Sequence, residues 1–145
     1  MIILIGSDHA GFELKEKCKR YIEDVLNKDV KDIGVYSDDS SDYPDIAHKL
    51  AEDISKDRSK VGILICGTGI GMSIVANRYK GVRAALCHDL YTTKYSRLHN
   101  NANILVMGGR VVGDGLALEM IKLFLETPFE GGRHKRRVEK IDNRE

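Results

Sequence analysis

Residues 62–78 read GILICGTGIGMSIVANR, and this stretch decides how the chain folds. It starts with a short apolar run that ends at Cys66, and three glycines follow at positions 67, 69 and 71. The remaining residues have an apolar spacing typical of a helix. A buried strand that turns through glycines into a helix is the repeating unit of parallel sheets. The stretch therefore predicts a strand and a helix joined at Cys66.

The same alternation continues on both sides of this stretch. We expect strands at residues 2–5, 30–35, 61–65, 82–86 and 104–107. Between and after them we expect helices, including residues 70–77 and 90–98, one with Pro44 in its first turn, and one whose inner face holds Leu14, Cys18, Tyr21 or Ile22, and Val25. The pattern predicts a three-layer α/β/α, doubly wound (Rossmann-like) fold around a five-stranded parallel sheet.

Size and composition restrict the class of protein. The 145 residues suggest one domain, residues 1–145, that is long enough for an ordinary core. Twenty-three basic and twenty-two acidic residues nearly balance, so nucleic acid and anionic membrane are not expected partners. The first apolar run is too short for a signal peptide or a membrane span. The three cysteines show no paired spacing and are interpreted as free thiols of a cytoplasmic protein.

Parallel strands gather their carboxyl ends at one edge of the sheet, where ligands bind. The expected strand ends carry an aspartate and histidine pair, a thiol, a second such pair and an arginine: Asp8-His9, Cys66, His88-Asp89 and Arg110. Asp8 and His9 are equally compatible with a simple helix cap. His88 and Asp89 are interpreted as structural, with Asp89 capping the next helix.

Three standard motifs fail at the glycine turn. A dinucleotide fingerprint needs a glycine at Met72, a cysteine-phosphatase loop needs an arginine there, and a Walker loop needs a lysine that the turn lacks. Two readings remain, an amide nest for an anion and a tight connection without a ligand. Amides beside Cys66 would favour its thiolate, as a nucleophile or as a general base. Cys18 and Cys87 are interpreted as small buried hydrophobes.

The remaining polar residues are ambiguous when each is taken alone. His99 follows a helical stretch and is more typical of a cap than of a catalyst. No histidine has zinc-type spacing to a cysteine or another histidine, so no metal site is expected. The basic tail is usually solvated, but Arg133 and Arg137 are four residues apart. In a helical turn they would share a face and could clamp a phosphate, with Arg110 as a third contact.

Five segments together resemble one family: GSDHAGFELK, CGTGIGMSIVANR, HNNAN, MGGRVVG and GGRHKRRVEKI. They occur in order over nearly the whole chain, and the combination resembles ribose-5-phosphate isomerase of type B. The isomerases of allose 6-phosphate and galactose 6-phosphate share that fold. The resemblance implies interconversion of an aldose and a ketose phosphate through an enediolate, in the pentose phosphate pathway, with no metal or organic cofactor.

The resemblance also assigns roles to residues. Cys66 would be the base that moves a proton between C2 and C1, while His99 would open the sugar ring with help from Asp8. The enediolate would be held by the loop amides and the Thr68 hydroxyl, from Gly67, Thr68, Gly69, Ile70 and Gly71. The phosphate and the sugar would be bound by His9, Arg110, Arg133, Arg137 and Asn100.

By the same resemblance, the site lies between two subunits of a homodimer or homotetramer, with residues 131–145 as a basic tail at the interface. Tyr43 would line the pocket or simply pack at the start of its helix. Three alternatives stay open: an isomerase of allose 6-phosphate or galactose 6-phosphate, a non-catalytic phosphate- or nucleotide-binding module, and a thiol redox protein. The last is disfavoured because the chain has no C-x-x-C motif.

Overall fold

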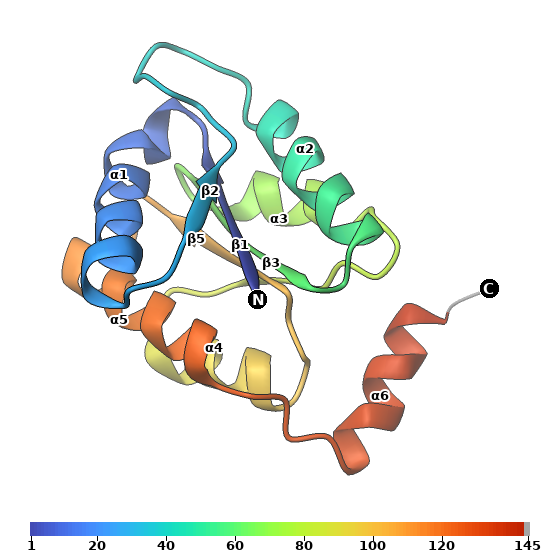
Figure 1. The fold of residues 1–145 in the computed structure, drawn as a ribbon. Helices are drawn as coiled ribbons and strands as arrows, with labels where there is room; N and C mark the ends of the chain where they lie inside the picture. The colour runs from blue at the N-terminus through green and yellow to red at the C-terminus, as the bar shows by residue number, and fades with distance from the viewer. Residues whose placement is uncertain (144–145) are drawn as a thin grey trace.

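The centre of the molecule is a sheet of five parallel strands, as the sequence predicts. The computed structural model describes residues 1–143, and residues 144–145 of the expected tail lie outside the described part. The strands are β1 (Ile2–Ser7), β2 (Val30–Asp32), β3 (Lys60–Cys66), β4 (Ala84–Leu86) and β5 (Ile104–Gly108). Their order is β2-β1-β3-β5-β4, and each neighbouring pair is parallel. The sheet is at the centre of Figure 1.

Helices cover both faces of the sheet, which confirms the three-layer fold (Figure 1). Helices α1 (Phe12–Arg20), α4 (Leu90–Leu98) and α5 (Asp114–Glu126) lie on one side, and α2 (Tyr43–Lys56) and α3 (Ile70–Ala76) lie on the other. Side chains alternate along the strands: Leu4 and Leu64 are buried against α2 and α3, and Ile5 and Ile65 are buried against α1 and α5. Cys66 belongs to the α2 and α3 side.

One expected core position is wrong. We expected Val25 on the inner face of the first helix, but its side chain is 61% exposed. The α-helical part ends at Arg20, and residues Tyr21–Val25 form a π-helical turn, η2. A π turn has more residues per turn than an α-helix, so the inner face moves along the sequence by one position. Leu26 packs against the core in place of Val25.

Strand β4 is an edge strand of the sheet, and a side chain covers part of its free edge. The Asn77 side chain, just after α3, donates from Nδ2 to the Ala84 carbonyl at 3.0 Å and accepts at Oδ1 from the Ala84 N–H at 2.8 Å. Both outward backbone groups of Ala84 are therefore hydrogen-bonded by one amide.

The basic tail forms a helix of its own, α6 (Arg133–Asp142), after the glycine pair at 131–132. In Figure 1 this red helix stands apart from the layered body. Arg83, just before β4, anchors it with an ion pair to Asp142 at 2.9 Å, and Val138 is buried. The tail thus lies near the amino ends of the strands. Among residues 1–143, no helix combines the length and apolar character that a bilayer crossing requires.

Candidate active site

The loop after β3 is shaped around Cys66. The cysteine is only 4% exposed, and the backbone reverses at Gly69, whose φ of +79° is left-handed. A Cβ atom at Gly69 would lie 3.1 Å from the Met107 carbonyl oxygen, so both the backbone angle and the close approach require glycine. The Thr68 hydroxyl accepts a hydrogen bond from the Ile70 N–H at 3.2 Å and fixes the turn.

The loop after β1 brings Asp8 beside this turn. Asp8 is 6% exposed, its N–H donates to the Ile65 carbonyl, and its Oδ1 accepts from the Gly11 N–H at 3.1 Å. The capping role considered from the sequence is therefore real. A Cβ atom at Gly11 would lie 2.5 Å from the Ile65 carbonyl oxygen, so glycine allows the first turn to pack directly on β3.

His9 is fixed by a residue that the sequence did not point to. The Ser41 N–H donates to Nδ1 of His9 at 3.1 Å, while the His9 N–H donates to the Ser41 hydroxyl at 3.0 Å. Because Nδ1 accepts, a neutral His9 carries its proton on Nε2. Ser41 lies in the long connection before α2, where no local motif marks it.

A cleft of about 440 Å³ joins these two loops. It is lined by Asp8, Tyr43, Cys66, Gly67, Thr68, Ile70, Gly71 and Ile74. The cleft lies between the ends of β1 and β3, where the strand order reverses, which is where doubly wound sheets bind ligands. Tyr43 forms one wall: a Cβ atom at Gly71 would lie 2.3 Å from the Tyr43 ring, so glycine admits the tyrosine.

Arg110 reaches the same edge from β5. Its N–H donates to the Gly67 carbonyl at 3.0 Å, and the Gly109 N–H donates to the Cys66 carbonyl at 2.7 Å. The Arg110 guanidinium approaches Gly67, since a Cβ atom there would lie 3.5 Å from Nη1. One arginine therefore flanks the thiol loop within the chain.

Four expected site residues lie away from the cleft of their own chain: His99, Asn100, Arg133 and Arg137. Helix α4 starts at the carboxyl edge and runs back, so His99 caps its end shortly before β5 begins. Cys66 pairs with Gly108, at the far end of β5 from Ile104. The four residue steps between those ends span about 13 Å. Helix α6, with both arginines, is anchored at the same amino edge.

The other two cysteines are structural, as expected. Burial raises the pKa of the Cys18 thiol to about 12, and the nearby Asp114 adds to this. Burial also raises the pKa of Cys87, although hydroxyl groups around it act in the opposite direction. Neither residue lines the cleft. The structural reading of the second pair is also confirmed: His88 accepts from the Gly108 N–H, and Asp89 caps α4 by accepting from the Thr92 N–H at 2.7 Å.

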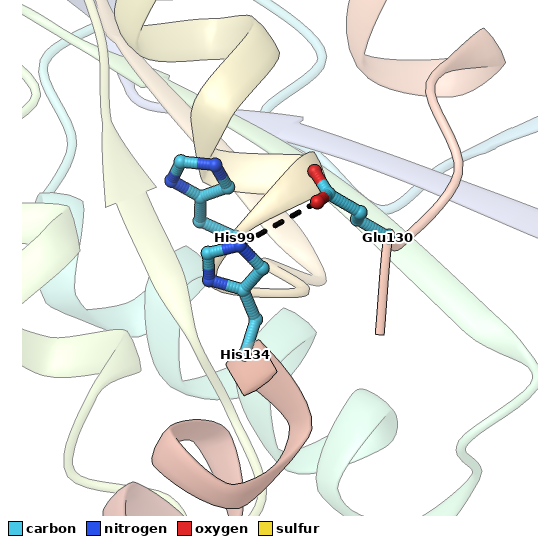
Figure 2. Close-up of side chains that lie close together, drawn as sticks. All are labelled: His99, Glu130 and His134. Carbon is cyan, nitrogen blue, oxygen red and sulfur yellow. Dashed lines mark ion pairs between the residues drawn. The ribbon is translucent and has the colours of Figure 1, made fainter. Parts of the chain in front are cut away.

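His134 belongs to the charged tail segment, yet it is buried at 4% exposure. Its ring stacks on His99, with centroids 4.0 Å apart and planes at 14°. Burial lowers the pKa of His134, and the neighbouring His99 ring lowers it further. Glu130 lies beside the stack (Figure 2). The sequence separation of 35 residues between the two histidines (134 − 99) hides this contact from any local pattern.

The geometry defines an α/β protein with a cysteine-lined cleft at the switch point of a parallel sheet. Residues 3–141 match the family model described as Ribose/Galactose Isomerase. The chain belongs to this family, in the group of ribose-5-phosphate isomerase B, and the predicted resemblance is confirmed.

Three relatives illustrate the family. A ribose 5-phosphate isomerase from Thermotoga maritima is 54% identical with a TM-score of 0.92, and the match covers 97% of this chain and 96% of that one. The Mycoplasma genitalium ribose-5-phosphate isomerase B with bound ribulose-5-phosphate is 42% identical with a TM-score of 0.91, covering 96% and 92%. A D-erythrulose-4-phosphate isomerase of Pectobacterium atrosepticum is 44% identical over 143 residues, covering 96% and 91%.

Proposed function

We propose that this sugar-phosphate isomerase interconverts D-ribose 5-phosphate and D-ribulose 5-phosphate through an enediolate, with Cys66 as the base and without a metal ion. One observation carries the proposal: the loops after β1 and β3 meet in a single cleft with the Cys66 thiol in its lining. The cleft also has an aspartate, a hydroxyl and turn amides, which are the groups that such a proton transfer needs.

In the proposed reaction, ring opening exposes the carbonyl group of ribose 5-phosphate at C1. The Cys66 thiolate then removes the proton from C2 and returns it to C1. The hydroxyl proton passes from O2 to O1, so that the carbonyl group forms at C2. Negative charge develops on oxygen in the enediolate between these steps. The amides of residues 67–71 and the Thr68 hydroxyl would hold that oxygen, and one such donor is worth about 3 kcal/mol of barrier.

The second half of the site is proposed to come from another copy of the chain. His99 would open the ring with Asp8, and Asn100 would contact the sugar. Both His99 and Asn100 lie at the amino edge of the sheet, so neither meets Cys66 of its own chain. A homodimer or homotetramer that pairs opposite edges would complete each cleft. The tail, residues 131–145, would lie at that interface.

Phosphate binding is assigned to His9, Arg110, Arg133 and Arg137. His9 and Arg110 flank the cleft from the same chain, where Ser41 holds the His9 ring. Arg133 and Arg137 lie one turn apart on α6 and would arrive from the partner. The three free, buried cysteines fit a reducing compartment. On this basis we propose a cytoplasmic location.

The test is turnover by chelator-treated protein, with ribose 5-phosphate and ribulose 5-phosphate as one pair. Allose 6-phosphate, galactose 6-phosphate and D-erythrulose 4-phosphate are assayed in parallel. We expect the highest kcat/KM for the pentose pair, with no loss after chelation. A higher kcat/KM for a hexose phosphate or the tetrose phosphate would change the proposed substrate but leave the proposed mechanism in place. Tight binding of sugar phosphates with no turnover would favour the non-catalytic binding module.

A further inference from the structure

Two histidines and a glutamate converge where α4 ends and α6 begins. His99 caps α4, and the segment after α5 passes this end, where the Glu130 N–H donates to the Leu98 carbonyl at 3.1 Å. Helix α6 then begins and places the His134 ring under His99. Figure 2 shows the stacked rings with the Glu130 carboxylate at their side.

The His134 ring has an unmet polar atom. The residue is 4% exposed, and its Nε2 has no hydrogen-bond partner among residues 1–143. The nearest carboxylate oxygen, Oε1 of Glu130, is 3.7 Å away, too far for a hydrogen bond. A buried nitrogen without a partner costs free energy, and a metal ion is one way to satisfy it.

The distances suit one small cation after a local adjustment. One donor atom from each of His99, Glu130 and His134 lies within 4.8 Å of the other two. Donors that share a tetrahedral Zn²⁺ are about 3.4 Å apart. The rings are stacked, so one of them must turn for both nitrogens to face a common point. Glu130 is exposed and free to swing inward.

We propose that His99, Glu130 and His134 form a binding site for Zn²⁺ or a similar transition-metal ion, and that its occupation inhibits the isomerase by sequestering His99. Two imidazoles and a carboxylate are a ligand set that Zn²⁺ accepts, with a fourth position left for water. Arg133 and Arg137 on α6 oppose an added cation, so the affinity should be moderate. The inhibitory half rests on the proposed role of His99.

Binding is tested directly on chelator-treated, full-length protein by competition for Zn²⁺ with a chromogenic indicator. We expect one Zn²⁺ per chain, and at least tenfold weaker binding by Glu130→Gln and by His134→Ala. Glu139→Gln on α6 and His48→Ala on α2 are matched controls that should bind as tightly as the unmodified chain. Co²⁺ should give the visible absorption of a tetrahedral site. No binding, or unchanged binding by both site variants, would overturn the site.

Inhibition is tested separately with Zn²⁺ in the isomerase assay. We expect reversible loss of turnover, restored by chelator, with the inhibition constant raised at least tenfold in Glu130→Gln. Zn²⁺ bound at this site without inhibition would overturn the regulatory half and count against His99 as the ring-opening group. Normal turnover with no Zn²⁺ binding would remove the metal site and leave the proposed function intact. Zn²⁺ binding by a chain without turnover would support the metal site and overturn the proposed function.

Discussion

Cys66 differs from Cys18 and Cys87 in its surroundings. All three thiols are buried, but only Cys66 lines the cleft, with Asp8 and turn amides beside it. Burial raises the pKa of the other two, which keeps them as neutral thiols. The same residue type therefore packs within the core at two positions and lines the cleft at the third.

Replacing Cys66 with alanine should remove the base and leave the binding groups in place. We expect kcat for ribose 5-phosphate to fall about 10²- to 10⁴-fold, the usual contribution of a general base. The affinity for the sugar phosphate, measured by calorimetry, should change little. Cys87→Ala serves as the control and should keep kcat. Substantial turnover by Cys66→Ala would assign the proton transfer to another group.

Lys15 is among the largest fully buried side chains of the described residues, and its charge is neutralised by Asp32. Its ammonium donates to both Asp32 carboxylate oxygens, at 2.8 and 2.7 Å, and to the Val35 carbonyl. Burial alone would raise the pKa of Asp32. Hydrogen bonds from Lys15, the Gly34 N–H and Lys19 outweigh it, so that the pKa lies below its ordinary value.

Asp32→Asn should therefore destabilise the fold by about 3 kcal/mol or more at neutral pH, because a buried lysine loses its counterion. A lowered carboxyl pKa gives stability that is complete above the unfolded value, near 4, and is lost as pH falls through the folded value. Urea unfolding at pH 7 and pH 3 should show this loss in the unmodified chain and a smaller one in the variant. Glu126→Gln, which breaks only the exposed pair with Lys122, should change stability by under about 0.5 kcal/mol.

At the scale of elements, α6 combines an anchored inner side with a charged outer side. His134 and Val138 are buried, while Arg133 and Arg137 are exposed and one turn apart. The helix is thus held to the molecule, and its two arginines are free for a ligand. This arrangement meets the condition that the sequence left open, namely that the tail be helical.

Arg133→Ala and Arg137→Ala should each raise KM for ribose 5-phosphate about tenfold with little change in kcat. A phosphate clamp holds ground state and transition state alike, so its loss appears in KM. Lys135→Ala removes an equal charge from the opposite face of α6 and should leave KM near the unmodified value. Equal effects at all three positions would indicate general electrostatic attraction in place of a clamp.

The elements with strong apolar patterns were predictable, and those with special geometry were not. Strands β1, β3 and β5 stand out as apolar runs because both faces of the sheet are covered, whereas β2 contains Lys31 and Asp32 and gives a weaker signal. Val25 was misplaced because a π turn changes the helical period, which no local residue signals. Ser41 escaped notice because its contact with His9 spans 32 residues. The contact between His134 and His99 spans a similar separation and was missed for the same reason.

At the scale of the molecule, the strand order alone explains which site residues meet. Asp8, Cys66 and Arg110 follow three neighbouring strands, β1, β3 and β5, so their common edge could be predicted from the parallel pattern. The expected role of His99 could not be predicted in this way, because His99 lies at the other edge and the sequence marks its role only through family resemblance. A single chain holds both halves of the expected site, but on opposite edges.

Two inactive variants should therefore restore activity when they share a dimer. Cys66→Ala and His99→Ala, co-expressed with different tags, form heterodimers in which one cleft has both intact residues. With random pairing, about a quarter of the normal specific activity should return, since half of the dimers are mixed and each has one working cleft. Purified heterodimers should have about half. Absence of any recovery in purified heterodimers would place both groups in the same chain.

The Asn77 side chain also limits how another extended segment could pair with the sheet at β4. By occupying Ala84, it leaves Leu86 as the one outward-facing residue of the three-residue β4 whose backbone can still pair. An extended segment of another molecule would find no continuous row of free backbone donors and acceptors at this edge. The edge therefore does not favour extension of the sheet into a ribbon or fibril. Any assembly through this side would have to rely on side-chain surfaces, which allow a closed pair with fixed geometry.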